Sequence, residues 1–218
     1  MTLESIEVQT GPQPGASLIV LHGLGDSGHG WTSICEELDL SPIGDVRFVL
    51  PHADERPVTI NNGYRMRAWY DIAGPGRPED DAGLRASQKQ VEALIAREKQ
   101  RGVPASRIVL MGFSQGCAMT LMTGLRQPER LAGLVALSGY LPLADKLAAE
   151  RHMMNADIPI FMAHGRQDPV IPLARATWSR DELKKLGYAI EWHEYDMQHS
   201  ASIEEIGDLN RWLLKVLA

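Results

Sequence analysis

Short apolar runs alternate along the chain with longer stretches whose apolar residues recur every three or four positions. The runs are mostly apolar, as in strands covered on both faces, and they occur at 17–21, 46–50, 107–111, 131–137 and 158–163. Two further stretches, 5–8 and 188–195, alternate polar and apolar residues as exposed strands do. Helical spacing marks 31–38, 87–99, 118–126, 143–154, 174–186 and 203–217. Strands and helices in this alternation predict an α/β fold, with a mostly parallel sheet between helices on both faces.

One long segment, 54–85, interrupts this pattern. Prolines, glycines and asparagines break it repeatedly, and a loop of this length inside a compact domain is usually functional or mobile. It nevertheless carries aromatic and apolar residues: Tyr64, Met66, Trp69, Tyr70 and Ile72. The segment is either a flap over a binding groove or a surface loop that tucks its aromatic side chains into a small core, and the sequence leaves both interpretations open.

Composition narrows the class of protein. The chain has 218 residues, 44% hydrophobic and 23% charged, which suits one globular domain, 1–218. Its formal net charge is −6, so there is no strongly basic balance of the kind that favours nucleic acid or anionic membranes as partners. No apolar run approaches the length of a membrane span, and the N-terminus lacks the regions of a signal peptide. We therefore expect a cytoplasmic protein. Cys35 and Cys117 lack metal-site spacing and are expected to be buried thiols.

The stretch Gly112-Phe113-Ser114-Gln115-Gly116 carries the first chemical signal. It follows an apolar run and precedes a helical pattern, which is the context that a Gly-x-Ser-x-Gly nucleophile turn requires. Glycine at both ends removes the Cβ atoms that would collide across so sharp a turn. The following helix directs its N-terminal N–H groups toward the serine. Ser114 is therefore a candidate nucleophile, and the alternative is an ordinary strand-to-helix turn.

A nucleophilic serine needs a base, and the base needs a third group to orient it. In an open α/β sheet these groups come from loops beyond the carboxyl ends of strands. Asp168 follows the run 158–163 and His199 follows 188–195, so the chain order is serine, acid, histidine, as in the α/β-hydrolases. We therefore expect Ser114, Asp168 and His199 to form a catalytic triad.

Other histidines and acids fit this order less well. His22 and His52 precede the serine, His152 lies in a predicted helix, His164 precedes Asp168 and His193 lies inside a strand pattern. Asp196 is too close to His199 in sequence to come from a separate strand end, and Asp157 precedes its strand.

An oxyanion hole needs N–H donors that point at the developing negative charge. The N–H of Gln115 is one candidate. The backbone near Gly23 and Leu24, in the glycine-rich loop after 17–21, is the other. That loop matches neither a Walker A sequence nor Gly-x-Gly-x-x-Gly, so a phosphate cradle is disfavoured.

Several motifs together resemble the phospholipase/carboxylesterase family, which includes acyl-protein thioesterases, lysophospholipase-like enzymes and bacterial carboxylesterases. They are His22-Gly-Leu-Gly-Asp-Ser-Gly28, Gly112-Phe-Ser-Gln-Gly116, Leu137-Ser-Gly-Tyr-Leu-Pro142, His164-Gly-Arg-Gln-Asp-Pro-Val170 and His199-Ser200. The resemblance covers nearly the whole chain and implies a compact α/β-hydrolase fold without a large cap domain. It implies that Ser114 is the nucleophile, Asp168 the acid, His199 the base, and the N–H groups of Leu24 and Gln115 the oxyanion donors.

The resemblance also bears on substrate binding and on two departures from the family. Residues 68–72 resemble a segment beside the acyl groove. The apolar side chains of the broken stretch 54–85 must also find cover, so Met66, Trp69, Tyr70 and Ile72 are expected to help line that groove. Tyr70 stands where phenylalanine is commoner, and Cys117 stands where a second glycine is expected. Family members are often dimeric, which makes a homodimer an expectation from the family alone.

We therefore expect a serine hydrolase that cleaves carboxylic esters, and also thioesters, of short to medium acyl chains through an acyl-enzyme intermediate. It would need no metal or organic cofactor. The alternatives with the same chemistry are an acyl-protein thioesterase or a lysophospholipase, acting on acylated protein or lysophospholipid. An alternative of another class, a catalytically silent binding module with this fold, is disfavoured by the complete triad.

Overall fold

A single seven-stranded sheet organises the protein, whose computed structural model describes residues 3–218. The strand order is β1-β3-β2-β6-β7-β8-β9, and β1 pairs antiparallel with β3 while the other neighbours pair parallel. The bounds are β1 Ser5–Gln9, β2 Ala16–Leu21, β3 Val46–Pro51, β6 Ile108–Phe113, β7 Gly133–Leu137, β8 Ile160–Gly165 and β9 Ile190–Tyr195. The predicted α/β fold with a mostly parallel sheet is confirmed.

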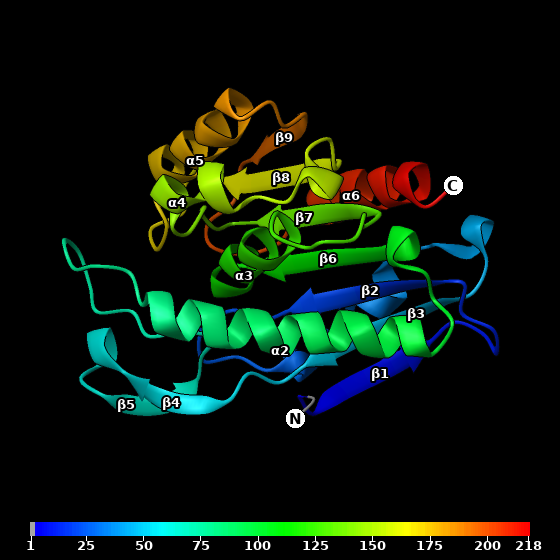
Figure 1. Ribbon diagram of the computed structural model, residues 1–218, viewed down its shortest axis with the longest axis horizontal. Coiled ribbons are helices and arrows are strands. Elements are labelled where there is room, and N and C mark those ends of the chain that lie inside the picture. The colour runs from blue at the N-terminus through cyan, green and yellow to red at the C-terminus, as the bar shows by residue number, and fades with distance from the viewer. Residues whose placement is uncertain (1–2) are drawn as a thin grey trace.

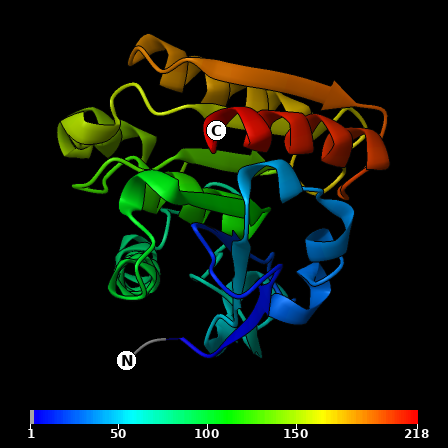
Figure 2. The same ribbon diagram turned by 90° about the vertical axis from the view of Figure 1, so that its right-hand side faces the viewer.

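Helices cover both faces of this sheet (Figures 1 and 2). Their bounds are α1 Ile34–Glu37, α2 Asp81–Gln100, α3 Gln115–Gly124, α4 Ala144–Glu150, α5 Leu173–Lys185 and α6 Ile203–Val216. Short 3₁₀ segments lie at Gly28–Trp31, Ser41–Ile43, Thr59–Asn61, Ala105–Arg107 and Met153–Asn155. Helices α2 to α5 lie on one face, and α1 and α6 lie on the other.

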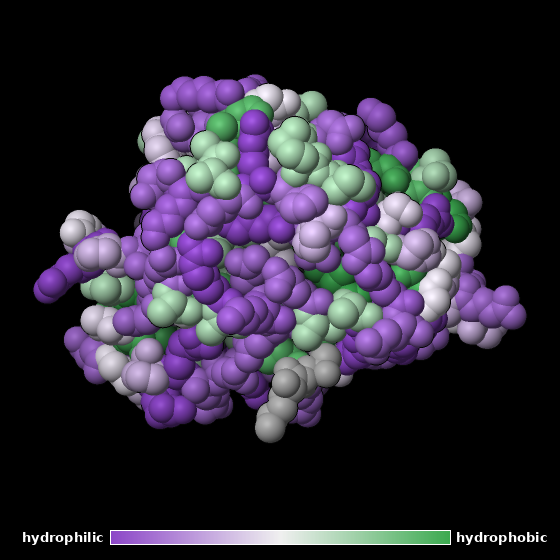
Figure 3. All heavy atoms as spheres, viewed as in Figure 1, coloured by the Kyte–Doolittle hydropathy of each residue, from purple (hydrophilic) through white to green (hydrophobic). Residues whose placement is uncertain are grey.

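Each face of the sheet has its own apolar core. Leu94 of α2 and Met119 of α3 belong to the first cluster, and Leu213 of α6 belongs to the second. Each such side chain, fully buried, stabilises the fold by about 1.5–3 kcal/mol relative to exposure. Hydrophilic side chains dominate the outer face seen in Figure 3, as expected of a sheet whose apolar strands are covered. No helix within residues 3–218 has the length and apolar character needed to cross a membrane.

The segment 54–85 is more regular than its sequence indicates. Strands β4 (Glu55–Val58) and β5 (Tyr64–Arg67) pair as an antiparallel hairpin, and α2 begins at Asp81 rather than near 87. Asp80 caps α2 because its side chain accepts a hydrogen bond from the Gly83 N–H. The first turn of α2 has few apolar residues, so its helical pattern is weak. The expected helix at 31–38 is also shorter, with a 3₁₀ turn followed by α1.

The parallel strands end at one edge of the sheet, which gathers the loops that follow them. In Figure 1 the arrowheads of β2, β6 and β8 point the same way. The loops after β2, β6, β8 and β9 carry Leu24, Ser114, Asp168 and His199 respectively. This edge is where ligands bind in open α/β sheets.

Candidate active site

Ser114 lies on a strained turn between β6 and α3. Its backbone has φ 56° and ψ −115°, a conformation that residues with a side chain rarely adopt. The turn is so tight that a Cβ on Gly112 would lie 2.1 Å from the carbonyl oxygen of Gly116. A Cβ on Gly116 would lie 2.0 Å from the Leu21 carbonyl oxygen, so both positions require glycine.

Ser114, His199 and Asp168 form a continuous hydrogen-bonded chain. The His199 Nε2 atom lies 2.9 Å from Ser114 Oγ, and His199 Nδ1 lies 2.6 Å from Asp168 Oδ2. A carboxylate can only accept, so Nδ1 carries the proton and Nε2 is free to accept the serine O–H. The ring of Phe113 packs against His199 with centroids 4.7 Å apart. The three side chains predicted from chain order are therefore linked by hydrogen bonds through His199.

Asp168 is fixed by further partners. Its Oδ1 atom accepts the N–H groups of Val170, at 2.8 Å, and Ile171, at 2.9 Å. His164 Nε2 donates to the Ile171 carbonyl oxygen at 2.8 Å and lies 3.4 Å from Asp168 Oδ2. Burial lowers the pKa of His164, which favours its neutral form beside the carboxylate. From the sequence alone, His164 is set aside because it precedes Asp168 in the chain. The sequence did contain a signal for the contact between His164 and Asp168, because His164 lies at the end of β8, four residues before Asp168.

The other candidates lie elsewhere or make different bonds. Asp196 accepts a hydrogen bond from Gln167 on the surface, and the carboxylate of Asp157 pairs with Arg130. His52 accepts the N–H of Gly28, and His193 lies next to Glu191 in β9.

Two backbone N–H groups stand near the serine without another acceptor. Within residues 3–218 no hydrogen bond uses the N–H of Leu24 or that of Gln115. A Cβ built on Gly23 would lie 3.4 Å from the Cβ of Ser114, so the loop after β2 passes directly beside the serine. Gln115 is the first residue of α3, where a free N–H and the helix dipole both favour negative charge.

A cavity of about 1220 Å³ opens over this site. Ser114 and His199 lie in its wall, and the serine keeps 9% of its surface exposed. Its lining includes several apolar and aromatic residues: Trp31, Ile34, Ile72, Phe113, Tyr140, Ile171 and Ile206. The hydroxyls of Tyr70 and Tyr140 lie 2.7 Å apart, and the Arg175 guanidinium stacks 3.4 Å from the centre of the Tyr140 ring.

Of the four residues predicted for the acyl groove, two line the cavity and two do not. Tyr70 and Ile72 line the cavity, whereas Met66 and Trp69 are not among the described residues that do. Trp69 is fully buried in the first core cluster, so its placement in the groove wall is corrected to a core position. The physical reason is that its indole N–H has a buried acceptor, the His22 carbonyl oxygen.

The histidine, cysteine and acidic side chains of residues 3–218 include no group of three or more arranged to hold a metal ion. Cys117 is buried and Cys35 half-buried, and both are free. The arrangement at the sheet edge is instead suited to nucleophilic attack by a serine on an acyl carbonyl, with a histidine to move the proton.

A sheet of this topology, with a serine on a strained strand-to-helix turn hydrogen-bonded to a histidine and an acid, defines a serine hydrolase with the α/β-hydrolase fold. The chain belongs to the Phospholipase/Carboxylesterase family, whose model matches residues 3–217. It is a serine hydrolase of the carboxylesterase and acyl-protein thioesterase type.

Several individual proteins are similar to this chain in sequence or in structure. The chain is 43% identical over 207 residues to acyl-protein thioesterase 1 of Yarrowia lipolytica, covering 91% of this chain and 90% of the relative. Its structure is similar to the crystal structure of SOBER1 from Arabidopsis thaliana, with a TM-score of 0.88, 30% identity and coverage of 93% and 99%. It is also similar to acyl-protein thioesterase 2 of Zea mays, with a TM-score of 0.84, 29% identity and 99% of each chain covered.

Proposed function

We propose that the protein hydrolyses thioesters between fatty acyl chains and protein cysteines, with Ser114 as nucleophile, His199 as base and Asp168 as the acid that orients it. The observation that carries the proposal is the 2.9 Å contact between Ser114 Oγ and His199 Nε2 in the wall of an open cavity. The names of the curated relatives support the thioesterase role over that of a general carboxylesterase.

In the acylation step, Ser114 Oγ attacks the acyl carbonyl carbon while its proton passes to His199 Nε2. The carbonyl oxygen becomes an oxyanion, which the N–H groups of Leu24 and Gln115 stabilise. Asp168 stabilises the imidazolium through its contact with Nδ1. The intermediate then collapses, the carbon–sulfur bond breaks, and His199 gives its proton to the leaving thiolate. The acyl group remains as an ester on Ser114.

Deacylation repeats the sequence with water. His199 Nε2 accepts a proton from water, whose oxygen attacks the acyl-enzyme carbonyl, and the same N–H groups hold the second oxyanion. The ester bond to Ser114 breaks, His199 returns the proton to the serine oxygen, and the fatty acid leaves. The net reaction is hydrolysis of the thioester to an acid and a thiol. An oxygen ester follows the same steps with an alcohol as leaving group.

We expect the acyl chain to lie against Tyr70 and Ile72, and the position of both residues in the cavity lining supports this expectation. Burial of a methylene contributes roughly 0.8 kcal/mol, so a groove wall sets how kcat/KM grows with chain length. Shortening Ile72 to alanine should flatten that growth for longer chains and leave the shortest substrate nearly unaffected. An unchanged profile would mean that the acyl chain lies against another part of the cavity.

Two alternatives share the chemistry or the fold. A carboxylesterase or lysophospholipase differs only in the leaving group, and the family description names carboxylesterases and phospholipases together. A silent binding module shares the fold but has no activated serine. The expected cytoplasmic location, the single domain and the homodimer stay predictions.

A substrate panel separates these roles. The purified protein is given S-acylated peptides, p-nitrophenyl esters and lysophospholipid, each with matched acyl lengths, and Ser114→Ala serves as the inactive control. The proposal expects kcat/KM to be highest for the S-acylated peptides. If oxygen esters are hydrolysed and thioesters are not, the protein is a carboxylesterase. If no substrate is hydrolysed and a fluorophosphonate does not label the protein, it is a binding module.

A further inference from the structure

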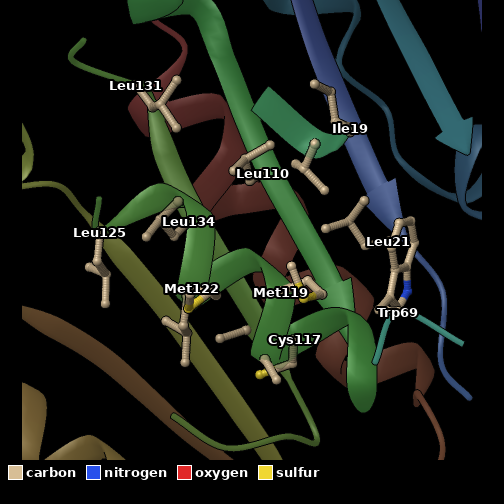
Figure 4. Close-up of a cluster of buried hydrophobic side chains, with 14 of the residues drawn as sticks. Ile19, Leu21, Trp69, Leu110, Cys117, Met119, Met122, Leu125, Leu131 and Leu134 are labelled. Carbon is tan, nitrogen blue, oxygen red and sulfur yellow. The ribbon is translucent and has the colours of Figure 1, made fainter. Parts of the chain in front are cut away.

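Trp69 connects two parts of the site that are far apart in sequence. Its indole Nε1–H donates to the carbonyl oxygen of His22 at 2.9 Å, and its backbone N–H donates to the side-chain oxygen of Gln115 at 2.8 Å. Figure 4 shows Trp69 beside Leu21 at the carboxyl end of β2, where the loop to Leu24 begins. The side chain is fully buried, so both bonds are shielded from water.

The Gln115 side chain is held at both of its amide atoms. Besides accepting from Trp69, it donates from Nε2 to the Tyr70 carbonyl oxygen at 2.8 Å, and only 2% of Gln115 is exposed. Its own backbone N–H is one of the two proposed oxyanion donors. The side chain of Gln115, the first residue of α3, is therefore hydrogen-bonded to the backbone of residues 69–70. The Ser87 hydroxyl of α2 in turn donates a hydrogen bond to the Trp69 carbonyl oxygen.

The other proposed donor is fixed through His22. The His22 Nδ1–H donates to the Gly23 carbonyl oxygen at 2.7 Å, and this carbonyl belongs to the same peptide unit as the Leu24 N–H. The Nε2 atom accepts the Ala53 N–H at 3.0 Å. The peptide before Gly23 is held in turn by the indole of Trp69, whose ring lies 5.3 Å from that of His22.

We propose that Trp69 is a positioning residue that sets the spacing between the two oxyanion donors, by holding the His22 carbonyl with its indole and Gln115 with its backbone N–H. This role rests on the proposed function. Trp69 touches neither the nucleophile nor the cavity, and it acts through the two segments that carry Leu24 and Gln115.

Such a role has a kinetic signature. Oxyanion donors must lie about 2.7–3.1 Å from the position of the charged oxygen, which exists only in the transition state. Loosening their spacing therefore lowers kcat and weakens the binding of tetrahedral analogues, while ground-state substrate binding changes little. Substitution of a residue that only fills the core would lower stability without lowering kcat selectively over substrate binding.

The test replaces the indole N–H with as little other change as the side chain allows. Site-specific replacement of Trp69 by 3-benzothienylalanine puts sulfur in place of the N–H and keeps the ring volume. Trp69→Phe removes both the N–H and part of the ring. Trp212→Phe is the matched control, because Trp212 is a buried tryptophan in the second core cluster, away from the cavity.

For both Trp69 variants we expect kcat for a short S-acylated peptide to fall by about ten- to a hundredfold, with KM within about twofold of the parent value. The inhibition constant of an acyl trifluoromethyl ketone should rise by the same factor as kcat/KM falls. Trp212→Phe should change melting temperature but none of these constants.

A benzothienylalanine variant with the parent kcat and inhibition constant would overturn the role of the indole N–H, even if Trp69→Phe fails to fold. An effect confined to KM would also overturn it. Neither result would affect the proposed function, which fails if the parent protein does not hydrolyse S-acylated peptides or if Ser114→Ala keeps its turnover.

Discussion

At the scale of single residues, the contacts of Asp168 distinguish it from the other acids near His199. Its two oxygens accept from His199 and from two backbone N–H groups, whereas Asp196 lies on the surface against Gln167. Asp168→Asn places an amide opposite the imidazole and cannot stabilise its positive charge. We expect kcat to fall by about 10⁴-fold, as in the serine protease that serves as the general template. Asp196→Asn, measured in the same assay, should keep a kcat near that of the parent. If Asp196→Asn lost activity and Asp168→Asn did not, Asp196 would be the acid of the triad.

Glu205 is a second residue whose environment makes a prediction. It is fully buried in the first turn of α6, and its carboxyl oxygens have no hydrogen-bond partner within residues 3–218. Burial raises its pKa from 4.5 to about 7. A raised folded-state pKa means that neutral Glu205 contributes stability fully below about pH 4.5, and that this contribution is lost as pH rises through about 7.

Glu205→Gln removes this titration. We expect the unfolding free energy of the variant, relative to that of the parent, to increase by on the order of 3 kcal/mol as pH rises from about 5 to 8. Above this range the difference should stay constant. Melting curves of both proteins between these pH values measure the gain. If the difference in unfolding free energy between the two proteins does not vary with pH, the pKa of Glu205 is not raised in the folded protein.

The grouping of Ser114, Asp168 and His199 could be predicted because each follows a strand, and parallel strands end at one edge. The position of Trp69 could not. Its indole acceptor lies 47 residues away in sequence, in a loop whose path only the folded chain defines. His164 was similarly ambiguous, because a histidine at a strand end can face the site or the core.

At the scale of elements, the turn between β6 and α3 depends on glycine more than on any other residue type. A Cβ on Gly116 would meet the backbone of β2, and backbone cannot move aside as a flexible side chain can. Gly116→Ala should therefore lose most activity and lower the melting temperature. Gly15→Ala is the control, since a Cβ added there would meet nothing within 4 Å. Equal behaviour of the two variants would contradict this account of the turn.

Element boundaries were predictable where the apolar pattern was strong and not where capping decided them. The buried strands β2 and β3 were located within a residue of their observed bounds. The start of α2 depends on Asp80, a single polar side chain, and the β4–β5 hairpin lies in a stretch whose prolines and glycines hide any strand period. Local chemistry rather than periodicity set these limits.

At the scale of the whole molecule, the two core clusters lie on opposite faces of one sheet and share its strands. Loss of either cluster would expose the strands that support the other. We therefore expect a single cooperative unfolding transition, with equal calorimetric and van't Hoff enthalpies. Two separated transitions would contradict the prediction of one domain.

The central claim is that Ser114 is the activated nucleophile of this hydrolase, and covalent labelling with a fluorophosphonate tests it most directly. After digestion, mass spectrometry locates the adduct. The account predicts modification of the peptide that contains Ser114, none in Ser114→Ala, and strongly slowed modification in His199→Ala. Labelling that persists in folded Ser114→Ala, or that maps to another residue, would contradict it.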